Sequence, residues 1–197
     1  MAQVEKKKAE IAGQDYLAGK FIIAMPGMQD PRFEGAIIYI CGHDPTGAMG
    51  LVINKLADSI SFRNLLEQLE IEVEGKLPNH PVHFGGPLEM GRGFVLHSAD
   101  YLHESSVKIT DDVVLTATID ILKDLALDKG PQHALLALGY SGWSPGQLET
   151  EILENGWLEV EGDKEILFEI ENDLKREKAI RKLGIDPSML SAISGNA

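Results

Sequence analysis

The sequence has very little cysteine: Cys41 is the single one among 197 residues. An internal disulfide is therefore excluded, which is typical of proteins from a reducing compartment. Neither a Cys-x-x-Cys nor a His-Glu-x-x-His motif is present, so the sequence predicts no metal site. Cys41 ends an apolar run and has no basic neighbour, and we expect an inert thiol in the core.

Basic residues are also scarce. Eighteen Lys and Arg stand against thirty-one Asp and Glu, and the formal net charge is −13. A protein that binds DNA or RNA directly needs cations to displace counterions from the phosphates. The two basic clusters, at residues 6–8 and 175–182, are mixed with or flanked by acids, which is typical of a solvated tail and a solvated helix face. The composition therefore disfavours direct nucleic-acid binding.

Long apolar runs are absent. No run approaches the roughly 20 residues that a membrane-spanning helix needs. The first residues lack the apolar segment of a secretory signal. We therefore expect a cytoplasmic protein without membrane contact, made of a flexible polar arm at residues 1–18 and a single domain at 19–197.

Short apolar segments rich in β-branched residues alternate with glycine and proline turns. The expected strands cover residues 21–24, 35–41, 51–54, 81–84, 93–97, 113–118, 133–138 and 157–160. The expected helices follow Ser61, cover residues 121–126, follow residue 144, run from Asn172 to Leu183 and begin again near Pro187. The segment at 35–41 is apolar throughout, which indicates a strand covered on both faces. The two kinds of element do not alternate strictly, so the sequence predicts an α+β (mixed α/β) fold.

The segment Gly139-Tyr-Ser-Gly-Trp143 differs by one residue from the nucleophile elbow Gly-x-Ser-x-Gly. Trp143 occupies the place of the second glycine and would obstruct the close backbone passage. We therefore expect Ser141 to be a turn residue and Trp143 to be the wall of a pocket. After it, Ser144 and Gln147 have the spacing of a capping box, in which the Ser144 hydroxyl would accept the Gln147 amide.

Two further groups of residues are candidates for a site. His43 lies beside Asp44 at a strand end, where it could line a polar pocket or simply bind the backbone of a loop. Gly85 and Gly86 could expose backbone amides to an anion, with Arg92 as its cation, or could serve only as a tight turn. His83 is an expected strand residue three positions from His80, so alternation would send the two rings to opposite faces.

The chain resembles the YqgE/AlgH family of bacterial proteins from residue 19 onward. The resemblance rests on Phe21-Ile-Ile-Ala-Met-Pro-Gly-Met28, His43-Asp44, Gly47-Ala-Met-Gly-Leu-Val-Ile-Asn54, Gly85-Gly-Pro87, Gly93-Phe-Val-Leu-His97 and Gly139-Tyr-Ser-Gly-Trp-Ser-Pro-Gly-Gln-Leu-Glu149, with Asn155 and Trp157 in register. It implies an α+β fold with a branched, mixed β-sheet, part of which closes into a small barrel surrounded by helices. Ala36 departs from the family's usual serine, and the helix at 173–183 lacks a tryptophan often found there.

The resemblance implies no defined reaction, since the family is described as transcriptional regulators or as proteins of unknown function. We expect a cytosolic regulatory protein that acts indirectly, through a protein or small-molecule partner, or a small-ligand-binding protein, without a cofactor. The predicted pocket residues are His43, Asn54, Gly85, Gly86, Pro87, Ser141, Trp143 and Gln147. The alternative is a hydrolase or transferase that acts on a small substrate, a phosphorylated one included, through Ser141 or His43.

Overall fold

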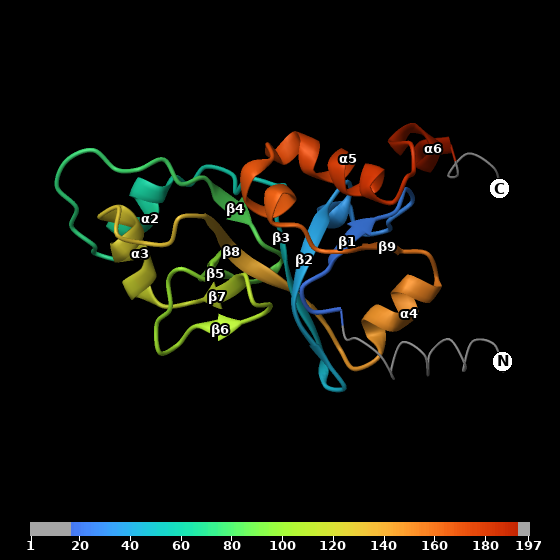
Figure 1. Cartoon of the computed structure of the whole chain (residues 1–197), viewed down its shortest axis with the longest axis horizontal. Coiled ribbons are helices and arrows are strands. Elements are labelled where there is room, and N and C mark those ends of the chain that lie inside the picture. The colour runs from blue at the N-terminus through green and yellow to red at the C-terminus, as the bar shows by residue number, and fades with distance from the viewer. Residues whose placement is uncertain (1–16, 193–197) are drawn as a thin grey trace.

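A curved, branched β-sheet organises the computed structural model, which describes residues 17–192 (Figure 1). Within these residues nine strands follow the order β6-β7-β5-β8-β3-β2-β1-β9, with β4 attached to β8. The strands are β1 (Phe21–Ala24), β2 (Ile37–Asp44), β3 (Gly47–Val52), β4 (Val82–Phe84), β5 (Leu88–Ser98), β6 (Val107–Lys108), β7 (Val113–Thr116), β8 (Ala134–Trp143) and β9 (Trp157–Val160). The helices are η1 (Pro31–Phe33), α2 (Phe62–Gln68), α3 (Ile119–Ala126), α4 (Gln147–Leu153), η2 (Glu165–Glu169), α5 (Asn172–Lys182) and α6 (Pro187–Ala192).

The predicted α+β class and the branched sheet are confirmed. Every pairing is antiparallel except that of β4 with β8, so the sheet is mixed as expected. The predicted N-terminal arm lies outside the described residues except for its last two positions, 17 and 18. Of these, Leu17 is buried.

The branch point is the long strand β8. Its first half lies between β4 and β5, where Leu136 pairs with both Val82 and Val95. Its last three residues pair instead with β3, with Ser141 opposite Gly50. Gly139 lies between the two halves with a φ of 72°, a left-handed conformation that glycine adopts readily. The strand can therefore change partners without ending.

This strand overturns the predicted strand-to-helix turn at residues 139–143. The elbow geometry is absent because these residues continue β8, and α4 begins only at Gln147. The expected capping box is half formed. The Gln147 side chain accepts the Ser144 backbone N–H at 2.9 Å, but the Gln147 N–H donates to the Ser144 backbone carbonyl rather than to the hydroxyl.

Strand alternation gives the sheet two apolar faces at β1 and β2. Phe21 and Ile23 belong to a core cluster that includes residues of η2 and α5, whereas Ile22 and Ala24 pack with residues of α4 and β9. The prediction that the segment at 35–41 is covered on both faces is confirmed for residues 36–41, which alternate between the same two clusters, whereas Gly35 is exposed. Figure 1 shows α5 and α4 on opposite sides of β1 and β9. At the other end of the sheet, α2 and α3 form a third cluster with β4 and β5.

Lys175 on α5 corrects the prediction of a wholly solvated basic helix face. The residue is only 3% exposed, and its Nζ donates to the backbone carbonyls of Ile53 and Leu167, each at 3.0 Å. No ion pair of Lys175 is present among the described residues. Desolvation lowers the pKa of Lys175 from its ordinary value of 10.5 to about 8.

This burial predicts a specific pH dependence of stability. Between pH about 8 and 10.5 the unfolded chain binds a proton at Lys175 that the folded chain has lost. The free energy of unfolding therefore gains roughly 3 kcal/mol from Lys175 as the pH rises through this window. In Lys175→Met this gain is missing, so we expect wild-type stability to rise relative to the variant in urea unfolding at pH 7.5, 9 and 10.5.

The comparison with Lys175→Met is needed because other groups titrate with the opposite sign. Burial raises the pKa values of Cys41 and Tyr39, which lowers stability at high pH in both proteins alike. Parallel stability curves for wild type and variant would contradict the assignment of a buried, charged Lys175.

Candidate functional site

A pocket of about 780 Å³ opens between α4, the loop after β1, and the ends of β8 and β9. Most of its wall is apolar, which is typical of small-molecule sites, and its volume falls in their usual range. The apolar lining residues are Met25, Pro26, Met28, Phe33, Pro87, Leu88, Trp143, Trp157 and Leu190.

The Glu151 carboxylate is the centre of the polar contacts in this pocket. Its Oε2 accepts the indole N–H groups of Trp143 at 2.9 Å and Trp157 at 2.7 Å, while its Oε1 accepts the side-chain amide of Gln147 at 2.8 Å. Hydrogen bonds to a carboxylate are stronger than those between neutral groups. The three donors therefore fix the position of the carboxylate and of both indole rings.

The secondary structure explains why these side chains meet. Gln147 and Glu151 are four residues apart on α4 and so lie on one face of the helix. Trp143 is the last residue of β8, and Trp157 is the first residue of β9, which returns the chain to the sheet beside Ala24. The two indole rings meet edge to face with their centres 5.9 Å apart.

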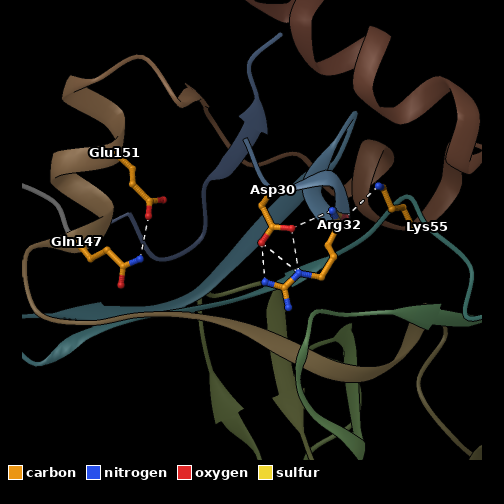
Figure 2. A network of polar contacts seen from close by, with 5 residues as sticks. All are labelled: Asp30, Arg32, Lys55, Gln147 and Glu151. Carbon is orange, nitrogen blue, oxygen red and sulfur yellow. Dashed lines mark hydrogen bonds and ion pairs between the residues drawn. The ribbon is translucent and has the colours of Figure 1, made fainter. Parts of the chain in front are cut away.

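The far side of the pocket carries an ion pair. The Arg32 guanidinium binds the Asp30 carboxylate through Nε and Nη2, the latter at 2.6 Å, and these bonds hold the pKa of Asp30 below its ordinary value. The Arg32 carbonyl accepts Lys55 Nζ at 3.1 Å. Figure 2 shows Gln147 and Glu151 projecting from α4 toward the loop that carries this pair.

Three of the eight predicted pocket residues line this pocket: Pro87, Trp143 and Gln147. The other five, namely His43, Asn54, Gly85, Gly86 and Ser141, do not line it. The structure assigns each of these five a role in holding neighbouring chain segments together.

Ser141 and the two glycines mark a close crossing of backbone segments. The Ser141 side chain is fully buried, and its hydroxyl donates to the Gly85 carbonyl at 3.2 Å. A Cβ atom at Gly86 would lie 2.1 Å from the Tyr140 carbonyl carbon, so the residue must be glycine. Ser141 has no hydrogen bond to a histidine, and a fully buried hydroxyl is poorly placed to attack a substrate.

His43 is buried and has both ring nitrogens engaged. Nδ1 accepts the Leu17 backbone N–H at 3.1 Å, which leaves the proton on Nε2, where it is donated to Glu149 at 3.0 Å. Asn54 joins chain segments in a similar way. Its side chain accepts the Ile37 N–H and donates to the Gly35 carbonyl, each at 3.0 Å.

The remaining histidines and Arg92 lie apart from the pocket. The rings of His80 and His83 have different partners, since His80 packs on Phe62 whereas His83 binds the Leu136 carbonyl. Arg92, the expected cation of a phosphate site, pairs with Glu89 on β5. Among the residues that the structure describes, no three His, Cys, Asp or Glu side chains are grouped to hold a metal. Within residues 17–192 no helix has both the length and the apolar character that crossing a membrane requires.

Sequence reasoning missed Glu151 and the Asp30–Arg32 pair. Glu149 and Glu151 are two residues apart on α4 and so do not face each other, and Glu149 binds His43 instead. The available signal was the four-residue spacing of Gln147 and Glu151. That spacing becomes informative only once the sheet brings both tryptophans to the same helix.

Comparisons with known proteins identify a family and relatives of similar sequence. Residues 21–188 match a family model described as AlgH-like. The chain is 54% identical to the UPF0301 protein SPO0296 of Ruegeria pomeroyi, over 92% of this chain and 99% of that protein. It is 51% identical to a UPF0301 protein of Rhodopseudomonas palustris, over 93% of this chain and 88% of that one.

Two solved structures share the fold. The solution structure of the AlgH protein from Pseudomonas aeruginosa superposes with a TM-score of 0.76 at 36% identity, covering 94% of this chain and 98% of that chain. The crystal structure of DIP2367 from Corynebacterium diphtheriae gives a TM-score of 0.69 at 17% identity, covering 93% and 94% of the two chains. The second likeness concerns the fold alone.

The contacts of Glu151 lead to a prediction for stability. In Glu151→Ala the indole N–H groups of Trp143 and Trp157 lose their acceptor, and these two residues are only 7% and 4% exposed. Two unsatisfied donors should lower the free energy of unfolding by about 2 to 4 kcal/mol in urea titrations. Glu154→Ala, an exposed position on the same helix end, is the control and should change it by about 0.5 kcal/mol or less. Equal effects of the two substitutions would contradict the structural role of Glu151.

Proposed function

The chain belongs to the AlgH-like family, and we propose that it is a regulatory protein that binds a small ligand in the pocket beside Glu151. The observation that carries the proposal is a largely apolar pocket with a carboxylate held in place by three N–H donors. Ligand sites commonly combine such walls with a few fixed polar groups.

A preformed pocket favours binding because little has to be ordered when the ligand arrives. Trp143 and Trp157 are locked by their bonds to Glu151 and by their edge-to-face contact. Met25 and Met28 line the facing loop, and methionine side chains adapt to ligands of different shape. The pocket therefore has one rigid wall and one adaptable wall.

The regulatory part of the proposal is indirect. The net charge of −13 repels nucleic acid, so an effect on transcription would pass through the ligand or through a protein partner. The hydrolase or transferase hypothesis has less support. The hydroxyl of Ser141 is buried and bound to Gly85, and both ring nitrogens of His43 are engaged.

A ligand screen tests the proposal. We expect at least one compound from a panel of nucleotides, phosphosugars, flavins, amines, alcohols and carboxylic acids to raise the melting temperature. At a free concentration one hundred times its Kd, a ligand stabilises the folded state by about 2.7 kcal/mol, which corresponds to a shift of several degrees. If no compound of the panel raises the melting temperature, the result would count against a ligand pocket.

Two matched variants locate the binding. Leu88 lines the pocket and is 43% exposed, so Leu88→Tyr should narrow the pocket while leaving the fold intact. Met90 lies two residues further along β5, is 59% exposed and does not line the pocket. A hit should lose at least about tenfold in affinity in Leu88→Tyr and keep its affinity in Met90→Tyr, a tenfold loss being about 1.4 kcal/mol. The reverse pattern would place the ligand elsewhere.

A further inference from the structure

We infer that the ligand of this pocket is an organic cation, an apolar body that carries a protonated nitrogen and binds it to Glu151. The inference rests on the proposed function and names the chemistry of the ligand. A free amine and a lysine side chain presented by a protein share this chemistry.

Glu151 has unused hydrogen-bonding capacity. An ionised carboxylate offers about four acceptor positions, and three are filled, by Trp143, Trp157 and Gln147. Two of these bonds converge on Oε2, so the remaining position is on Oε1. That position can accept an N–H from a ligand in the pocket.

No cation of the described chain is paired with the negative charge of Glu151. None of the ion pairs among the described residues includes it. The one cationic side chain in the pocket wall, Arg32, is bound to Asp30 through both Nε and Nη2. All three donors to Glu151 are neutral, so its charge is solvated but not compensated.

The pocket wall carries more acidic than basic side chains. Its ionisable side chains are Asp30, Glu151, Glu154 and Arg32, three acids and one base. Once Arg32 neutralises Asp30, two carboxylates remain without a cation in the wall. A phosphate or carboxylate ligand would be repelled, whereas a cation would be attracted. This charge also disfavours the phosphorylated substrate of the alternative hypothesis.

Most of the pocket wall is apolar. Aromatic rings and methionines line the same pocket as the carboxylate, so a fully hydrated inorganic cation would leave these apolar walls uncovered. Aromatic rings next to a carboxylate are suited to an alkyl or aryl ammonium group, because the ring faces attract a cation and the apolar wall buries its organic body. The volume of about 780 Å³ admits a molecule much larger than a metal ion.

Intrinsic fluorescence gives a local readout. The chain has two tryptophans, and both line the pocket, so tryptophan emission reports on the pocket alone. The probes are 2-phenylethylamine, 2-phenylethanol and 3-phenylpropionate, which share a phenyl body and differ in the charge of the head group. We expect the amine to bind at least about tenfold more tightly than the alcohol, because a hydrogen bond between charged groups replaces a neutral one. We expect the acid to bind more weakly than the alcohol.

Glu151→Gln identifies the partner of the cation. This variant keeps the shape and one acceptor oxygen but removes the charge. We expect its affinity for the amine to fall at least about tenfold, and its affinity for the alcohol to change less than about threefold. Glu154→Gln removes the charge of an exposed carboxylate in the same pocket wall and should weaken amine binding by less than Glu151→Gln does. Far-ultraviolet circular dichroism checks that each variant is folded.

The outcomes separate the two proposals. Equal affinity for amine and alcohol in the wild-type protein, or tighter binding of the acid, would overturn the cationic ligand and leave the ligand pocket standing. That comparison needs no variant, so it holds even if Glu151→Gln fails to fold. No binding of any phenyl probe, together with silence in the wider screen, would remove the pocket function itself.

A fourth probe distinguishes the two sources of the cation. A Leu-Lys-Leu peptide with both termini capped, so that the lysine carries its only charge, presents the ammonium group on a chain as a protein partner would. Tighter binding of the peptide than of 2-phenylethylamine would indicate a lysine of a partner protein, and the reverse order would indicate a free amine.

Discussion

The fold depends on one backbone crossing, at the point where β8 changes from one half of the sheet to the other. Gly85 lies against this point, where its N–H donates to the Leu138 carbonyl at 2.9 Å and its carbonyl accepts the Val52 N–H at 2.8 Å. Gly139 contributes the left-handed turn of the strand. These bonds tie β4, β8 and β3 together where side chains would not fit. Because Trp143 ends the same strand, the crossing also sets the position of the pocket.

The sheet has two apolar faces, and the helices that cover them, α5 and α4, each contribute a charged side chain that is bound by neutral groups. Lys175 on α5 donates to two backbone carbonyls, and Glu151 on α4 accepts three N–H groups. Each charge is solvated by neutral dipoles of the opposite sense rather than by a counter-ion. The two charged residues differ in their access to solvent and ligands, since Lys175 is 3% exposed whereas Glu151 borders an open pocket.

The fold class could be predicted from the sequence, because the strands β1, β2 and β9 correspond to continuous or alternating apolar runs. The prediction failed at residues 139–143, since a glycine at positive φ can bend a strand as readily as end it. At the site, Trp143 was found because a large side chain stood among small ones. Glu151 was missed because its partners are set by the return of β9 to the sheet, a contact without a local sequence signal.

The energetics of Glu151 indicate that stability alone does not explain this residue. Moving a carboxylate out of water costs several kcal/mol even after the protein relaxes. Three hydrogen bonds to a charged acceptor contribute roughly 1.5 to 3 kcal/mol each, so the net effect lies near the break-even point. A leucine at 151 with phenylalanines at 143 and 157 would cover the same sheet face without that cost. A fixed charge at the wall of an apolar pocket is instead what discrimination among ligands requires, because the carboxylate rejects molecules that cannot donate to it.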